Sequence, residues 1–490
     1  MWLDTISNSS LGKSFHLNWA LNQVIISFHK STFSQIQFKN VKTFLAIVVN
    51  LKEINLLDSK ALTKIQSIIL VAIIVVAAVG VATIVLWNGP KQSSDTIKIG
   101  FLNDLDGSGK QGWQGITLAA EQINAEGGLL GKQIELIGED VDPYDVNVFS
   151  TGLNRLISFH EVDFIFGYSS AQLGFLVQEI ITQNKIIYIG GGTIPEAVTQ
   201  RVLDEYEKYK YYFHPAFNAT CGKLGVTDSL IHIREITGFN KIGYLAEDLG
   251  WTQEFLEQMD VSLPENGFEL VYKGVFPPFD TLDFSSYYAA AEAAGVEVLV
   301  PMIALDTGIP FAKEYYDRQS PMLIFGGICL EVSDSDGWEV TDGKCNHMDF
   351  GESPTSAGYP FTTKTLATRD AYFERWGEPI TLGAAYWYDA LRFIFTDSIE
   401  RAGTIETEAV IKALETVSVE TSNARNFVFT ESHALMMGTD ANDPNADYPI
   451  IIGFQWQDGV QVPVDPRKIM EEAGATITFP DWPGPWDNIS

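Results

Sequence analysis

The stretch IKIGFLNDLDGSGKQGWQGITLAAEQINAEGGLLGKQIELIGED, residues 97–140, decides the fold. It opens with an apolar run, residues 97–102, which predicts a strand. A Gly-rich loop and a helical pattern follow, Gly127 and Gly128 end the helix, and a second strand is predicted at 134–138. Strand, helix and strand in this order predict a βαβ unit and therefore a parallel sheet.

The same alternation continues along most of the chain and predicts an α/β fold with two Rossmann-like lobes. A polar, Tyr-rich stretch at 204–212 interrupts it, and we interpret this stretch as a crossing to the second lobe. The predicted helices are 149–159, 171–183, 224–237, 252–266, 284–294, 308–318, 365–376, 382–402 and 406–416. The predicted strands are 162–166, 186–189, 241–245, 268–275, 296–300, 322–325, 427–429 and 450–456.

Charge divides the chain into two parts. Residues 1–94 hold eight Lys and three acids, whereas the remainder holds 24 Lys and Arg and 60 acids, within a total net charge of −31. A body this acidic repels nucleic acid and anionic lipid, so neither is an expected partner.

An uncharged segment at 65–87 predicts one transmembrane helix, because it reaches about 34 Å as a helix and a bilayer core is roughly 30 Å thick. Lys60 and Lys64 precede it, so residues 91–490 are expected outside the cell. We therefore expect a single-pass anchor in the cell membrane, with residues 1–64 cytoplasmic or unassigned and 88–95 as a linker. A cleaved signal peptide is the alternative.

Three turns between strands and helices carry the candidate chemistry. Gly107, Gly109 and Gly112 form GxGxxG, but four residues separate them from the strand, which favours a flexible loop over a dinucleotide site. The GYSSA turn with Ser169 resembles a hydrolase nucleophile elbow, for which His433 is a late histidine in the required order. Alternatively, this turn and GGGTIPE one strand later bind an anionic group through free helix N–H groups. Ordinary helix capping at both turns is the third interpretation.

The chain resembles the extracytoplasmic solute-binding proteins of ABC transporters with the type I periplasmic-binding fold, and most closely the leucine-binding-protein-like group for branched-chain amino acids and amides. The resemblance covers about residues 97–456 and rests on INAEGGLLGK, on the GYSS and IIYIGGGTIPEA turns, on KIGYLAEDLGWTQEF and on MLIFGGICLE. It implies two lobes joined by a multi-crossover hinge, with lobe one at 96–216 and 349–435, lobe two at 217–348 and 436–478, and a tail at 479–490.

The resemblance also implies a ligand site between the lobes. Turns after the third and fourth strands would hold the carboxylate and amine of the ligand, an aromatic residue would cover it, and an acid would hold its amine. These roles map onto Ser169, Ser170, Gly191, Gly192, Thr193, Trp251 and Glu331, with Asp306 as the rival acid. Departures from the usual turns, GGG for Ser-Pro-Ala and PMIALD for a Gly-rich turn, leave the solute open.

The implied function is capture of a small polar solute, amino acid or amide-like, for ABC permease subunits, without catalysis, cofactor or metal. An extracellular receptor is the first alternative, and a hydrolase using Ser169 is the second. The extracytoplasmic setting and the loop between Cys329 and Cys345 also allow a disulfide between these two residues, and two unpaired cysteines are the alternative.

Overall fold

Two hydrophobic cores, each built around a parallel sheet, organise the part of the chain that the computed structural model describes. That part is residues 96–107, 109–168, 173–192, 195–305, 307–437, 449, 451–487 and 489. The first core draws on residues between 97 and 213 and between 372 and 435, and the second on residues between 219 and 350 together with four aromatic or aliphatic residues beyond 455. The predicted α/β class with parallel sheets is confirmed.

The first sheet has five parallel strands in the order β2-β1-β3-β4-β5. Ile97, Ile99 and Phe101 on β1 are fully buried because this strand lies inside the sheet with helices on both faces. The strands are β1 (Thr96–Asn103), β2 (Gln133–Asp140), β3 (Phe164–Tyr168), β4 (Ile187–Gly191) and β5 (Tyr212–Phe213).

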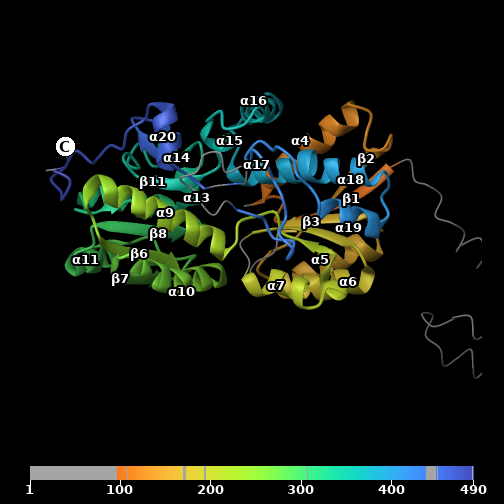
Figure 1. The fold of residues 1–490 in the computed structure, drawn as a ribbon, viewed down its shortest axis with the longest axis horizontal. Coiled ribbons are helices and arrows are strands. Elements are labelled where there is room, and N and C mark those ends of the chain that lie inside the picture. Colours follow the sequence, from red (N-terminus) through yellow and green to blue (C-terminus); the bar gives the residue numbers. More distant parts are fainter. Residues whose placement is uncertain are drawn as a thin grey trace, which may run out of the picture. The chain divides into compact units, whose positions relative to one another are not determined.

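Helices cover both faces of this sheet, with α4 and α17 on one face and α5 and α6 on the other (Figure 1). Gly115 on α4 permits the close approach of α17, because a Cβ there would stand 2.1 Å from the carbonyl oxygen of Ala384. The N-terminal helices are α4 (Lys110–Ala125), α5 (Val146–Ser158), α6 (Leu173–Asn184), α7 (Glu196–Asp204) and α8 (Tyr206–Tyr209). The later ones are α16 (Thr365–Trp376), the continuous run α17 (Leu382–Asp389), η1 (Ala390–Phe395) and α18 (Thr396–Ala402), and α19 (Thr407–Leu414).

The second sheet is also parallel, in the order β10-β8-β6-β7, with β9 paired to β8. Every residue of β8 is buried, as expected of a central parallel strand. Its strands are β6 (Lys241–Glu247), β7 (Glu269–Phe276), β8 (Val298–Ile303), β9 (Leu323–Ile324) and β10 (Ile328–Cys329). Its helices are α9 (Ala219–Thr237), α10 (Gly250–Glu265), α11 (Ser285–Ala294), α12 (Gly308–Arg318), α13 (Leu330–Ser333) and α14 (Gly337–Val340).

A small antiparallel sheet and the C-terminal segment complete the second lobe. The sheet is formed by β11 (Asp349–Glu352), β12 (Ile452–Gln457) and β13 (Val460–Asp465), with α15 (Pro354–Ala357) after β11 and α20 (Arg467–Ala473) after β13. Trp482 and Trp486 lie in the second core, and the Trp482 indole donates to the carbonyl of Ser320 at 3.0 Å. The Pro/Trp segment therefore packs as part of this lobe.

The chain crosses between the cores later than the Tyr-rich stretch predicts. Residues 204–212 remain in the first lobe, where they form the end of α7, α8 and the start of β5. The prediction of a crossing there is wrong, because Tyr212 and Phe213 are fully buried in the first core and the second core begins at Ala219. A second described crossing follows β11.

The predicted transmembrane segment at 65–87 lies outside the described residues. Among the helices from residue 96 onward that the structure describes, none is long and apolar enough to cross a membrane.

Candidate functional site

The two ligand turns predicted in lobe one start side by side. Tyr168 at the end of β3 pairs with Gly191 at the end of β4, so the segments that follow leave the same edge of the sheet. Carboxyl ends of parallel strands form the usual ligand edge of an open α/β sheet. Ser169, Ser170 and Thr193, which follow these strands, lie outside the described residues and stay predicted site residues.

The glycines of the second turn have packing reasons of their own. A Cβ on Gly190 would stand 2.8 Å from the Tyr212 hydroxyl, and one on Gly191 would stand 2.5 Å from the Trp387 ring. Gly192 has φ +86°, which favours glycine, and its carbonyl lies 2.6 Å from Nε2 of His214. Burial lowers the pKa of His214 to about 4, so the neutral ring donates this bond. Aromatic packing thus gives Gly190 and Gly191 a structural reason of their own, and the ligand role of Gly191 stays a prediction.

Lobe two presents a buried carboxylate, Glu247, at the end of β6. Its oxygens accept the backbone N–H groups of Ala304 and Leu305, both at 3.0 Å, and Thr307 Oγ1 lies 3.4 Å away. Trp251, near the start of α10, lies close enough to lower the pKa of this carboxyl. Burial raises the pKa of Glu247, while these donors act in the opposite direction. Glu247 therefore joins the end of β6 to the segment that follows β8.

Two tyrosines of lobe one face this carboxylate. Tyr144 follows β2 and Tyr168 ends β3, and the charge of Glu247 acts on both phenols. Burial raises the pKa of both, that of Tyr168 well above its ordinary value. The Tyr144 ring also meets that of Phe279 of lobe two, edge to face with centroids 6.2 Å apart. The rings of Tyr144 and Phe279 thus join the carboxyl edge of the first sheet to that of the second.

Of the two predicted amine-binding acids, Asp306 lies outside the described residues and Glu331 lies in α13, partly buried. Glu331 neighbours Asp334, whose carboxylate accepts the Leu382 N–H of lobe one at 3.4 Å. Burial raises the pKa of Asp334 to about 7, with Asp336 and Glu331 adding to the shift. Burial together with Asp334 likewise raises the pKa of Glu352. These acids meet where α13, β11 and the start of α17 come together.

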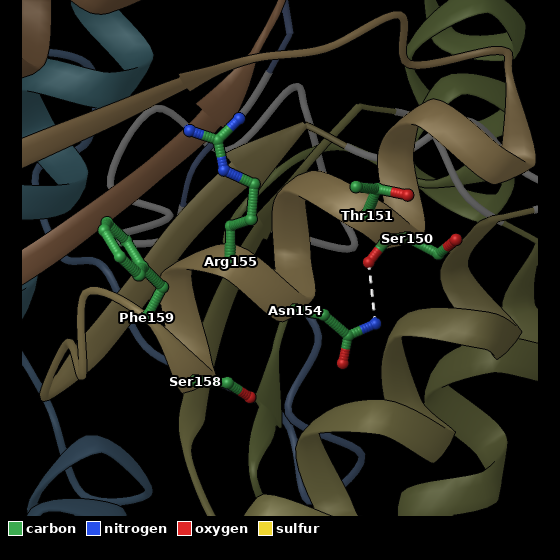
Figure 2. Close-up of a pocket in the computed structure, with 6 residues that line it drawn as sticks. All are labelled: Ser150, Thr151, Asn154, Arg155, Ser158 and Phe159. Atoms are coloured by element: carbon green, nitrogen blue, oxygen red, sulfur yellow. Dashed lines mark hydrogen bonds between the residues drawn. The ribbon is translucent and has the colours of Figure 1, made fainter.

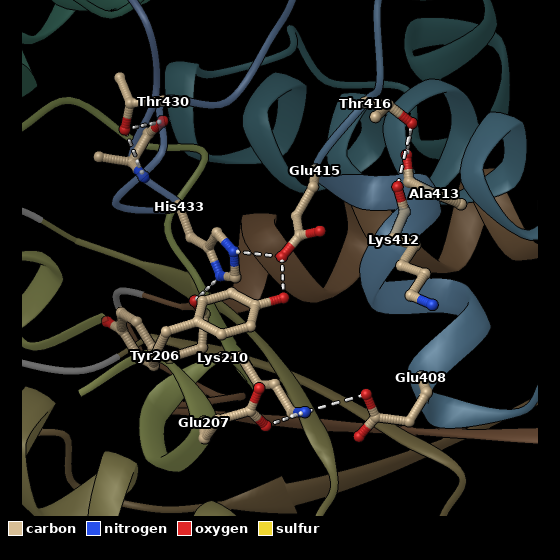
Figure 3. Close-up of polar contacts among 12 residues, drawn as sticks. Tyr206, Glu207, Lys210, Glu408, Lys412, Ala413, Glu415, Thr416, Thr430 and His433 are labelled. Atoms are coloured by element: carbon tan, nitrogen blue, oxygen red, sulfur yellow. Dashed lines mark hydrogen bonds and ion pairs between the residues drawn. The ribbon is translucent and has the colours of Figure 1, made fainter. Parts of the chain in front are cut away.

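His433, the late histidine of the hydrolase hypothesis, has both ring nitrogens engaged (Figure 3). Nε2 lies 3.2 Å from the Glu415 carboxylate and Nδ1 3.1 Å from the carbonyl of Tyr212. The ring stacks on Phe213 with centroids 4.0 Å apart, and Tyr206 donates to the same Glu415. His433 is only 1% exposed. It therefore ties α19 to β5 and is not open to act as a base for a serine.

The glycines of GxGxxG are likewise explained by packing. A Cβ on Gly109 would stand 2.3 Å from the Asp104 carbonyl, and one on Gly112 would stand 2.6 Å from the Trp387 ring. Gly109 lets α4 lie close to its own loop, and Gly112 lets it lie close to α17. Packing therefore explains both glycines.

The predicted disulfide is absent, because Cys329 and Cys345 are both free and buried. Cys345 Sγ lies 3.7 Å from the Gly337 carbonyl, and Cys329 packs against Gly308, where a Cβ would stand 2.8 Å from its sulfur. Burial raises the pKa of Cys345 to about 11 and that of Cys329 well above its ordinary value. Both behave as small apolar core residues.

A separate depression of about 430 Å³ lies on the surface of α5 (Figure 2). Figure 2 shows Arg155, Asn154 and Phe159 around it, and Asn154 donates to the carbonyl of Ser150 at 2.7 Å. Its lining comes from one helix and the residue that follows it, so it is distinct from the edge where the sheets meet.

Sequence reasoning named Trp251 as a site residue, which stays a prediction, and did not single out Tyr144, Tyr168 or Glu247. Glu247 carries a recognisable signal, a charged residue that ends a strand after an uncharged run at 242–246. Its donors are 57 and 58 residues further along the chain, and only the pairing of β6 with β8 brings them together.

Comparisons with known proteins agree with this architecture. The family model described as "Periplasmic binding protein" matches residues 96–440. A Leu/Ile/Val-binding protein homolog 7 from Brucella melitensis biotype 1 is 24% identical over 391 residues, which cover 78% of this chain and 94% of that protein.

Solved structures share the fold. A putative branched-chain amino acid ABC transporter protein from Silicibacter pomeroyi superposes with a TM-score of 0.67 at 18% identity, covering 79% of this chain and all of that one. The substrate-binding protein LivJ from Streptococcus pneumoniae, in complex with isoleucine, has a TM-score of 0.59 at 17% identity, covering 75% and 99%. Since the family model spans well over half of the sequence and the two-lobed parallel α/β fold agrees with it, the chain belongs to the periplasmic binding protein family.

Proposed function

We propose that this protein captures a small polar solute between its two lobes and delivers it to an ABC permease. The observation that supports this most is the edge-to-face contact of Tyr144, which follows β2, with Phe279, which follows β7, because it joins the carboxyl edges of both parallel sheets. Solutes bind at this edge in open α/β sheets, and a hinge between two such lobes allows closure on them.

The solute class we propose is amino acids or their amides, with branched-chain amino acids first. The names of the relatives support it, as do the rings of Trp251, Tyr144 and Phe279 around the junction, which suit an apolar side chain. Ser169, Ser170, Gly191, Gly192 and Thr193 are proposed to hold the carboxylate, with Trp251 as the cover and Glu331 or Asp306 near the amine. Glu247 already accepts the N–H groups of Ala304 and Leu305, so we assign it to holding the segment after β8 rather than to the amine.

We further propose that residues 65–87 anchor the protein in the cell membrane with the binding lobes outside. This part of the proposal rests on the uncharged segment and the charge difference on its two sides. We do not propose catalysis, since His433 is buried and engaged and the relatives carry the names of binding proteins.

A thermal-shift screen of the full chain tests the binding proposal. Leucine, isoleucine, valine, short amides, urea and short peptides are added separately. A solute at 100 times its Kd stabilises by roughly 2.7 kcal/mol, which raises the Tm by a few degrees. Absence of a shift with every one of these solutes would contradict the proposal.

Two variants then locate the site. Ser170→Ala and Trp251→Ala are expected to weaken the solute found in the screen by about tenfold to a hundredfold, measured by calorimetry. Glu265→Ala, at an exposed position on the same helix as Trp251, is the matched control and should leave Kd unchanged. Unaltered affinity in both test variants would place the solute elsewhere.

A further inference from the structure

Two glutamates form hydrogen bonds between the lobes. Each accepts hydrogen bonds from groups at the start of a helix in the other lobe. Glu254 on α10 of lobe two accepts the backbone N–H of Glu196, the first residue of α7 in lobe one, at 3.0 Å. The Glu196 side chain in turn accepts the backbone N–H of Thr220 at 3.0 Å and the Asn218 amide at 3.2 Å. Asn218 and Thr220 begin α9 of lobe two.

Helix starts suit carboxylates because their first N–H groups have no partner within the helix and carry partial positive charge. Both helices are long enough for this effect, with nine residues in α7 and 19 in α9. Each glutamate therefore satisfies a backbone group of the opposite lobe, and these bonds exist only while the lobes touch.

The surroundings make the Glu254 contact dependent on closure. Burial raises the pKa of Glu254, and the charges of Glu196 and Glu257 add to the shift. The Glu196 N–H and the Gln258 side chain act in the opposite direction. Separation of the lobes would return Glu254 to water and leave the first N–H of α7 to the solvent, so the balance between these states is sensitive to this one side chain.

We infer that Glu196 and Glu254 form a latch between the lobes and set how firmly the protein holds its solute. They act as positioning residues beside the predicted ligand turn at Thr193. This inference rests on the proposed function, because lobe closure controls retention only if the solute lies between the lobes.

The test measures the distance between the lobes without any solute, so it is separate from the search for the solute. Cysteines introduced at exposed positions, Gln183→Cys on α6 and Val261→Cys on α10, carry spin labels in the full chain purified in detergent. The three native cysteines are buried. Pulsed electron paramagnetic resonance then gives the populations of short and long distances between the two spin labels.

Glu254→Ala is expected to lower the ratio of short to long distances by about tenfold or more, as expected for a lost charge-assisted hydrogen bond. Glu196→Ala should act in the same direction, because it removes the bonds to Asn218 and Thr220. Glu265→Ala, exposed on the same helix, should match the unaltered chain.

If Glu254→Ala fails to fold, Glu254→Gln keeps the size of the side chain and removes its charge, and a smaller shift in the same direction is expected. An unchanged distance distribution in the folded Glu254 variant would overturn the latch. A shift toward shorter distances would also overturn it, since Glu254 would then hold the lobes apart. Neither result bears on the solute screen, whose failure would instead contradict the proposed function.

Discussion

Glu247 is a buried carboxylate that holds two segments of lobe two together. Its exposure is 0%, and it joins the end of β6 to the segment that follows β8. Glu247→Gln places an amide NH₂ against groups that are themselves donors, and we expect a loss of about 1–3 kcal/mol in unfolding free energy. Urea unfolding followed by tryptophan fluorescence measures it. Glu269→Gln, exposed at the start of β7, is the control, and equal stability of the two variants would contradict the prediction.

The cysteines give a second prediction at this scale. Cys221, Cys329 and Cys345 are buried and free, and the pKa of each thiol is raised by burial. A thiol reacts as its thiolate, so iodoacetamide should leave all of them unmodified in the native chain. In denaturant without reductant, mass spectrometry should find alkylation at all three. Two thiols that react only after reduction would reveal a disulfide and contradict the structure.

Among the elements, the small sheet of β11, β12 and β13 carries a carboxyl pair with a pH-dependent stability. Burial raises the pKa of Asp349 to about 8, the nearby Asp465 adds to the shift, and the Gly326 N–H, 2.9 Å from Asp349, opposes it. Asp465 itself accepts from Ser229 at 2.7 Å and lies 3.0 Å from His232 Nδ1. The folded protein therefore holds a proton on Asp349 that the unfolded chain releases near pH 4.

The sign of the effect follows from this difference in bound protons. Between about pH 4 and pH 8 the folded state binds more protons, so stability falls as the pH rises through this window. Asp349→Asn keeps an acceptor for Gly326 and should make the decline shallower by up to about 1.4 kcal/mol per pH unit. Urea unfolding from pH 5 to pH 8 measures the slope. Asp458→Asn, exposed in the turn of the same sheet, is the control and should keep the original slope of stability against pH. An unchanged slope in Asp349→Asn would contradict the prediction.

For the whole molecule, the sequence predicted the alternation of strands and helices because central parallel strands appear as uninterrupted apolar runs. The helices predicted at 308–318 and 365–376 are α12 and α16 with the same bounds. The Tyr-rich stretch was misread as the first crossing because β5 is only two residues long and gives no pattern. The site was less predictable than the fold, since Tyr144, Tyr168 and Glu247 meet only after both sheets have formed.

The last prediction concerns the topology of the full chain. Residues 1–94 carry an excess of five positive charges and the remainder carries −36, on the two sides of the uncharged segment at 65–87. Positive flanks stay in the cytoplasm, so we expect the binding lobes outside, which also fits a protein that meets solutes before import.

Protease added to intact cells should digest residues 96–490, whereas a cytoplasmic marker protein should remain whole. A cleaved signal peptide would release the lobes into the medium, and mass spectrometry of the membrane fraction distinguishes that case by the absence of residues 65–87 from the mature chain. Full protection of the lobes in intact cells, with digestion after lysis, would contradict the predicted orientation.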